Sequence, residues 1–399
     1  MIGFFIRIFN YANNHIKNVM YKIRVYIFSA RYRVDYINPI VIPESVDAER
    51  RPPESIVQNF SGRLSRFDYK TIFYDAYVNH GGRGVRLCGP PLRNLSEYVA
   101  SSVFRIDGND ISDNIRLKDE SKKQKSRIVG RKGRELTVIN EDFEISVPIS
   151  LSDSRTFRSK NVLVTLNKDN LFSWIFTWAS FYVKAHGVNA LLIYDTGSTN
   201  YTADELCHML SLVPGIEAVV VVHWPFVIGP FMERPGVKAE ADYMQVAMLD
   251  HAREKYLSAA RSVIHCDVDE LIYSNSGVSI CDAVQIAPNG AILVPGIWIS
   301  SETVSSRRPL IHCDFRHLDP TMDPCLPKWA FSPVRLSDGA DLQVHRIGRI
   351  GPLVADDRFR LAHFRGISTN WREYRTNYDS PSQYSAVCED ICHFIRPFL

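Results

Sequence analysis

Three carboxylates lie within four residues, in the sequence Asp267-Val268-Asp269-Glu270, directly after the short apolar run 262–266. Neighbouring carboxylates repel one another unless a cation or hydrogen-bond donors neutralise them. In an extended chain Asp267 and Asp269 point to the same face and reach a common ion. Hard oxygen ligands suit Mg²⁺ or Mn²⁺, which commonly bridge carboxylates to diphosphate oxygens. The pattern therefore predicts a catalytic metal site at Asp267 and Asp269; a solvated acidic turn is the alternative.

A second group of polar residues follows two earlier apolar runs. Thr165 and Asn167 close the first run, and Asp195 and Ser198 follow the second. Asp and Ser also favour plain turns and helix N-caps, so this group has a structural interpretation as well.

The elements that position these residues are a series of short, continuous apolar runs. Such runs are typical of strands that are covered on both faces. Between them, residues 171–185 and 237–258 have the apolar spacing of helices. Strand–helix alternation predicts an α/β fold with a mostly parallel sheet, whose ligands gather at the carboxyl ends of the strands. The four predicted strands are 162–166, 190–194, 218–223 and 262–266.

Several enzyme classes are disfavoured because their motifs are missing from the sequence. There is no Gly-x-x-x-x-Gly-Lys-Ser/Thr loop, no Gly-x-Gly-x-x-Gly after the first strand, no Gly-x-Ser-x-Gly and no His-Glu-x-x-His. A divalent cation stabilises the charge that develops on a departing diphosphate. The chemistry that fits is sugar transfer from a nucleotide sugar. A nucleotidyltransferase with a similar metal pair and a non-catalytic glycan-binding protein are the alternatives.

An ordered set of short motifs over roughly residues 160–375 resembles the GT-A glycosyltransferases, and more narrowly their family-92 and family-2-like group. The motifs are Thr165-Leu166-Asn167, Trp174, Trp178, His186-Gly187-Val188, Tyr194 to Thr199, Gln245, Asp267 to Leu271, Lys328-Trp329, Val344-His345 and His363-Phe364-Arg365. The resemblance implies a GT-A catalytic domain, which is Rossmann-like with a mostly parallel central sheet.

The resemblance also implies the roles of individual residues. It implies a nucleotide-sugar donor, with UDP-sugar expected, and Mn²⁺ or Mg²⁺ held by Asp267 and Asp269. His345 is expected as a further metal ligand or as a diphosphate contact. The expected donor-binding residues are Thr165, Asn167, Asp195, Ser198, Gln245 and Lys328. Lys328 is expected to place its charge on the phosphates, and a solvated lysine is the alternative. An inverting enzyme needs a carboxylate base. Glu302 is preferred over Asp314, Asp319 and Asp323 because it lies in the expected acceptor loop near Trp298. The implied acceptor is a glycan or glycolipid in cell-surface polysaccharide synthesis.

The remaining sequence predicts the domain organisation. Residues 66–150 alternate short β-type runs with turn residues, which predicts a small β-rich antiparallel accessory domain before a glycosyltransferase domain at 160–399. The expected strands of this accessory domain are 71–78, 97–106, 135–139 and 143–147. Residues 116–134 include nine basic residues, which form a solvated loop or hold an anionic lipid or polymer. The net charge of +3 gives no global preference for nucleic acid. Eight cysteines without a Cys-x-x-Cys pair disfavour a zinc ribbon.

The first 38 residues form a basic N-terminal segment. Residues 1–34 hold six basic residues and no acidic one, and their apolar stretches are too short to cross a bilayer. The segment predicts an amphipathic helix that lies on an anionic membrane surface or packs on the body of the protein. The expected location is the cytoplasm, with peripheral contact to the inner face of the cell membrane.

Overall fold

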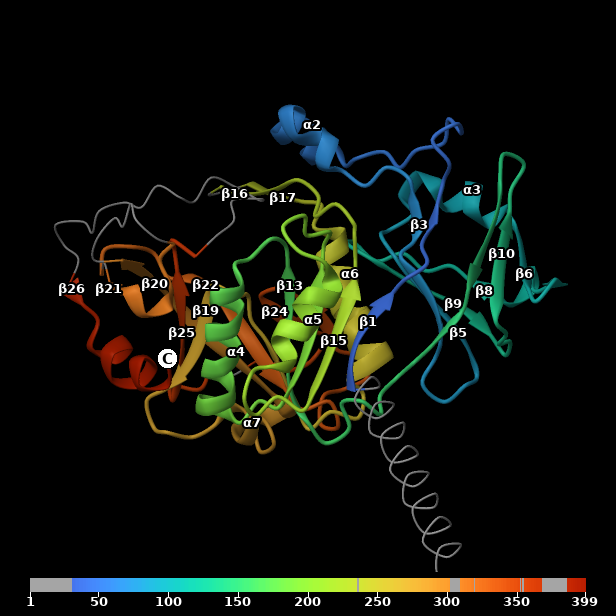
Figure 1. Cartoon of the computed structure of the whole chain (residues 1–399). Coiled ribbons are helices and arrows are strands. Elements are labelled where there is room, and N and C mark those ends of the chain that lie inside the picture. Colours follow the sequence, from blue (N-terminus) through green and yellow to red (C-terminus); the bar gives the residue numbers. More distant parts are fainter. Residues whose placement is uncertain are drawn as a thin grey trace, which may run out of the picture.

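Five parallel strands form the centre of a large mixed sheet in the computed structural model (Figure 1). The structure describes residues 31–234, 237–301, 309–318, 320–351, 353, 355–367 and 386–399. The parallel strands lie in the order β1 (Tyr32–Tyr36), β15 (Ala218–His223), β14 (Ala190–Asp195), β13 (Asn161–Asn167) and β18 (Ser262–His265). Residues 162–167, 190–195 and 218–222 are buried, because helices cover both faces of these strands.

The sheet continues beyond β18 with strands of both directions, so that eleven strands are joined within the described residues. β18 is followed by β22 (Cys325–Phe331), β20 (Ala291–Ser301), β21 (Phe315–Leu318) and β26 (Ala386–Val387). β25 (Phe359–Phe364) pairs in parallel with β20 and antiparallel with β19 (Glu270–Ser274). This last pairing brings the late part of the chain next to the acidic turn that precedes β19.

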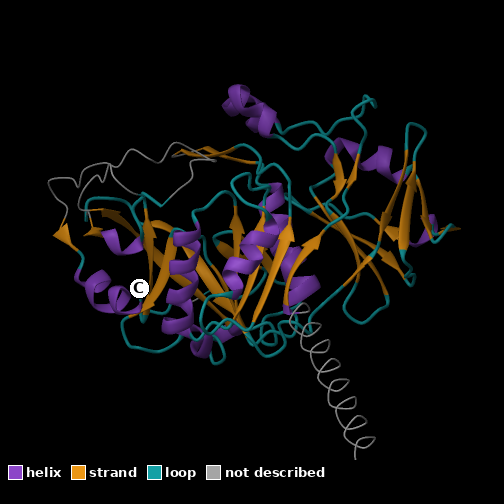
Figure 2. Cartoon of the chain, viewed as in Figure 1, coloured by secondary structure: helices purple, strands orange, loops and turns teal. Residues whose placement is uncertain are grey.

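Helices cover the sheet in two layers, and α4 and α5 cross in front of the strands in Figure 2. α4 (Phe172–His186) and α5 (Ala203–Ser211) pack on one face, and α6 (Tyr243–His251) packs on the other. α4 ends where Gly187 adopts φ 65°, a left-handed conformation that glycine takes without a Cβ clash. α5 begins with a reciprocal capping box between Thr202 and Glu205.

The accessory domain consists of two small sheets around their own apolar core. One sheet has the order β12 (Ser150–Leu151), β4 (Asp75–Val78), β5 (Gly84–Gly89), β9 (Gln124–Val129), β8 (Ile115–Arg116). The other has the order β11 (Glu144–Pro148), β10 (Glu135–Ile139), β6 (Val103–Ile106), β7 (Asn109–Asp110). Almost all of these strands lie within residues 66–150, where the sequence predicts short β-type runs, and β2 (Ile40–Val41) pairs with β3 (Thr71–Phe73) from outside that range.

The remaining elements are short. Two further hairpins are β16 (Phe231–Arg234) with β17 (Val237–Glu240) and β23 (Asp341–Gln343) with β24 (Arg346–Gly348). The other α-helices are α2 (Glu54–Phe60), α3 (Ser96–Ala100) and α7 (Ile280–Ala283). A π-helix, η4 (Ala252–Leu257), continues α6, and a second one is η7 (Ile391–Ile395). Short 3-10 turns are η1 (Ser61–Arg66), η2 (Arg93–Leu95), η3 (Ser112–Asn114), η5 (Pro288–Gly290), η6 (His312–Asp314) and η8 (Arg396–Phe398). Within the described ranges, no helix has the length and apolar character that a membrane crossing requires.

The α/β class and all four predicted strands of the main sheet are confirmed, and three local predictions are wrong. The helix expected at 237–258 starts only at Tyr243, because residues 237–240 pair with β16. The expected strand 97–106 begins as helix α3, since Leu92, Leu95 and Val99 are buried at helical spacing. Residues 32–36 of the N-terminal segment form strand β1 of the main sheet. The helix predicted before them lies outside the described residues.

Candidate active site

The acidic residues form a closed turn between β18 and β19. The backbone N–H of Glu270 donates to the carbonyl oxygen of Asp267 at 3.0 Å. The side chain of Glu270 folds back and accepts from the backbone N–H of Asp267 at 2.9 Å. His312, which burial keeps neutral by lowering its pKa to about 4, donates from Nε2 to the carbonyl oxygen of Val268 at 2.9 Å. The turn is therefore held from both sides.

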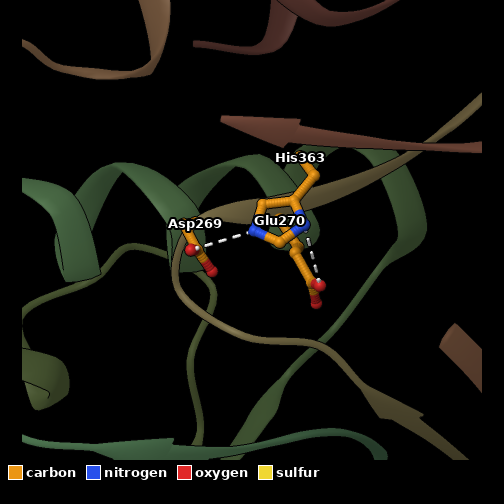
Figure 3. Close-up of side chains that lie close together, drawn as sticks. All are labelled: Asp269, Glu270 and His363. Atoms are coloured by element: carbon orange, nitrogen blue, oxygen red, sulfur yellow. Dashed lines mark hydrogen bonds and ion pairs between the residues drawn. The ribbon is translucent and has the colours of Figure 1, made fainter. Parts of the chain in front are cut away.

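His363 completes a group of three possible metal ligands with Asp269 and Glu270. Each of the three residues offers one ligand atom, and these atoms lie within 4.8 Å of one another (Figure 3). The group was identified among the described residues. Glu270 and His363 are directly opposite in the β19–β25 ladder, so their side chains point to the same face. His363 Nε2 is 3.1 Å from Asp269 Oδ2, and its Nδ1 is 3.6 Å from Glu270 Oε1.

The two carboxylates change the ionisation of the imidazole. Burial alone lowers the pKa of His363, but the charge and hydrogen bond of Asp269, a hydrogen bond with Cys325 and the charge of Glu270 raise it to about 10. Without a metal ion the ring is therefore an imidazolium that bridges the carboxylates. A metal ion that binds here must displace that proton.

Lys328 neutralises the other side of the acidic turn. Its ammonium is fully buried, with Nζ 2.7 Å from Asp267 Oδ2 and 3.2 Å from Glu270 Oε2. Burial lowers the pKa of Lys328, yet the charges of Asp267 and Glu270 raise it above its usual value, so the side chain stays charged. Asp267 consequently faces a lysine, and Asp269 faces a histidine.

An aromatic ring lies beside the three ligands. The half-buried ring of Trp298 stacks on His363, with ring centroids 4.1 Å apart and planes at 28°. Arg365, two residues further along the chain, has its guanidinium carbon 5.9 Å from the centroid of the same indole. These contacts fix the orientation of the imidazole.

A second polar cluster lies at the carboxyl ends of β13 and β14. The amide of Asn167 donates to Asp195 Oδ1 at 2.8 Å and to Ser198 Oγ at 3.3 Å. Asp195 also accepts from Ser198, at 2.5 Å from Oγ to Oδ1 and at 3.0 Å from the backbone N–H to Oδ2. The structure thus brings three of the predicted donor-binding residues together, at the same edge of the sheet as the acidic turn.

The other predicted residues occupy different positions in the fold. Thr165 is fully buried within β13 and its hydroxyl donates to the carbonyl oxygen of Leu166 at 3.1 Å. Gln245 is buried in the first turn of α6. His345 lies in the β23–β24 turn, where Nδ1 donates to the carbonyl oxygen of Pro327 at 3.0 Å. Glu302 lies outside the described residues.

The ligand group differs from the predicted one in two members. Glu270 and His363 belong to the group found among the described residues, whereas Asp267 and His345 do not. In the sequence, Glu270 is recognisable as the third carboxylate of the acidic turn. His363 stands out only as part of a short motif, because its contact with the turn depends on the pairing of β25 with β19.

Comparison with known proteins assigns no family to the chain. No family model matches the chain, and no curated protein matches it.

Proposed function

We propose that the protein is a metal-dependent glycosyltransferase, which transfers a sugar from a nucleotide-sugar donor to a glycan or glycolipid acceptor. The observation that carries the proposal is the convergence of Asp269, Glu270 and His363 at the carboxyl edge of the sheet. We propose UDP-sugar as the donor and the synthesis of cell-surface polysaccharide as the setting.

The strand order supports a GT-A fold for the main sheet. β13, β14 and β15 follow one another in one direction, and β18 then lies on the opposite side of β13. A reversal of this kind is a topological switch point, and ligands of open α/β sheets bind outside the carboxyl ends of the strands there. Asn167 ends β13 and Asp267 follows β18, so both polar clusters flank this point.

The ligand atoms fit a divalent cation. Two carboxylate oxygens and one imidazole nitrogen within 4.8 Å suit a small ion whose remaining positions diphosphate oxygens fill. The imidazole favours Mn²⁺ over Mg²⁺, because Mg²⁺ is bound mainly through oxygen. When bound, the cation supplies positive charge to the departing diphosphate.

The charges of this chain also support a divalent ion. Asp267, Asp269 and Glu270 carry three negative charges, and Lys328 supplies one positive charge. With His363 neutral as a ligand, the net charge of the group is −2, which balances the charge of one Mn²⁺. Lys328 is fully buried behind the turn, so we assign it to the carboxylates and not to the donor phosphates.

The acceptor hydroxyl must lose a proton during transfer, and we keep Glu302 as the proposed base. Asn167, Asp195 and Ser198 are proposed to shape the loop that holds the nucleotide. Their hydrogen bonds to one another make that loop a fixed platform.

The test is a panel of nucleotide sugars, each measured for binding and slow hydrolysis with and without Mn²⁺. We expect one donor to bind and hydrolyse only with Mn²⁺, and Asp269→Asn to reduce Mn²⁺ affinity by about 100-fold or more. The matched control is Asp282→Asn, which removes an exposed carboxylate paired with Arg261. Release of pyrophosphate from a nucleoside triphosphate and a sugar phosphate would identify a nucleotidyltransferase instead. Failure of the whole panel to bind would refute the proposal.

A further inference from the structure

The basic run 116–134 divides into two parts with different surroundings. Lys123 and Lys125 lie against the α6 side of the main domain, where they pair with Asp250 at 3.0 and 3.4 Å. Lys123 also pairs with Asp341 at 2.7 Å and is almost completely buried. These lysines therefore hold the accessory domain against the main domain.

The other part of the run extends a row of arginines across three strands. Arg127 on β9 lies directly opposite Arg86 on β5 and directly opposite Arg116 on β8. Like charges in such positions destabilise a sheet unless anions neutralise them. Arg86 pairs with Glu254 at 3.0 Å, but Arg127 and Arg116 are exposed.

Further basic residues lie at the two turns next to this row. Arg83 is in the β4–β5 turn, and Arg131 and Lys132 are in the β9–β10 turn; all three are exposed. The backbone N–H of Gly130 donates to the carbonyl oxygen of Arg83 at 3.0 Å, so the two turns are adjacent.

We name these exposed residues the basic tip, which consists of Arg83, Arg116, Arg127, Arg131 and Lys132. Within the described parts of the chain, no carboxylate forms an ion pair with any of the five. Among the residues that the structure describes, the only side-chain hydrogen bonds of the basic tip run from Arg116 to the backbone carbonyls of Asp113 and Ile115. Five uncompensated cations on one end of a domain form a strong anion-binding surface.

The basic tip is on the side of the molecule where the described chain begins. In Figure 1 the start of β1 and the β4–β5 turn are both at the lower side of the view, and α2 and α3 are at the upper side. Residues 1–30, which precede β1, carry Arg7, Lys17, Lys22 and Arg24 and no acidic residue.

We propose that the basic tip docks the accessory domain on an anionic phospholipid surface. A bilayer is broad, so it contacts the two turns and the strand row of the basic tip at once. Each Arg or Lys near an anionic bilayer adds to the attraction, and the effect weakens with salt. A linear polyanion binds along the row of arginines and leaves the β4–β5 and β9–β10 turns without a partner.

The test uses the full-length protein and sedimentation with phosphatidylcholine vesicles that contain phosphatidylserine. The variant Arg83→Ala/Arg131→Ala/Lys132→Ala removes three exposed side chains without touching the apolar core. We expect its partition coefficient to fall roughly 100-fold, with the remaining binding lost on adding salt. Binding to vesicles of phosphatidylcholine alone is expected to be negligible for both proteins.

The control variant Arg51→Ala/Lys118→Ala/Arg346→Ala removes the same charge from exposed residues elsewhere and should retain vesicle binding within about twofold. Equal partitioning of the tip variant and the wild type would disprove the docking surface. Loss of heparin binding in a protein that never sediments with the vesicles would identify a polymer partner and would also reject the proposal. The glycosyl-transfer assay is independent of this result, so the two proposals fail separately.

Discussion

The ammonium of Lys328 lies 2.7 Å from the carboxylate of Asp267, and the lysine is completely shielded from solvent. The first aspartate of the acidic turn is thus already neutralised by the protein. The second aspartate contacts an imidazole, whose proton a metal ion can replace. This division of partners is why the candidate metal centre consists of Asp269, Glu270 and His363.

Replacing Lys328 by methionine should destabilise the protein strongly. The substitution leaves the charges of Asp267 and Glu270 without their buried partner, which typically costs about 3–5 kcal/mol. Urea unfolding in the presence of EDTA measures the change. Lys160→Met is the control, because Lys160 pairs with Glu217 at the surface and its loss should cost less than about 1 kcal/mol. Equal effects of the two substitutions would contradict the buried-charge interpretation.

Two histidines should differ in their effect on metal affinity. His363→Gln removes a ligand and should weaken Mn²⁺ binding by about 100-fold or more. His345→Gln removes a hydrogen bond to the carbonyl oxygen of Pro327 and should change Mn²⁺ affinity by less than about threefold. Isothermal titration with Mn²⁺ compares them. A larger effect at His345 would restore the sequence-based ligand set and reject the one proposed here.

The stability of the metal-free protein should depend on the ionisation of His363. Its pKa is raised from the ordinary value of 6.5 to about 10, so protonation favours the folded state. The stabilising contribution is fully present below pH 6.5 and is lost as the pH rises through about 10. The difference in unfolding free energy between wild type and His363→Gln should therefore shrink from pH 6.5 to pH 10. A constant difference over this range would show that the imidazolium pairing contributes nothing.

A buried carboxylate at the domain boundary should be essential for stability. Asp75 of β4 accepts from His251 Nε2 at 2.9 Å and from Lys255 Nζ at 2.6 Å. Asp75→Asn leaves the buried Lys255 without a counter-charge and should cost about 3–5 kcal/mol, measured by urea unfolding at neutral pH. Asp282→Asn, at an exposed ion pair, is the matched control and should cost less than about 1 kcal/mol.

The contribution of Asp75 to stability should also depend on pH in the acid range. Burial raises the pKa of Asp75, but Lys255 and His251 outweigh it and lower the pKa below the ordinary value of 3.8. The contribution of Asp75 is therefore present above pH 3.8 and is lost as the pH falls through the lowered pKa. If the Asn variant were as stable as the wild type at neutral pH, the pairing with Lys255 would not hold the domains together.

The sequence by itself determined the central strands and the position of the acidic turn. Continuous apolar runs at 162–166, 190–194 and 218–223 have one stable place, a sheet covered on both faces, so local composition was sufficient. Asp267, Asp269 and Glu270 follow such a run directly, and their position at the end of a strand was therefore evident.

Only the tertiary structure decided which side chains meet that turn. Asp269 and His363 are 94 residues apart, and their contact depends on the register of β25 against β19. Lys328 reaches Asp267 because β22 pairs with β18, a relationship that the chain around either residue does not encode. Pairing between distant strands is selected by the packing of the whole sheet, so the histidine and the lysine at the turn followed from the fold and not from local pattern.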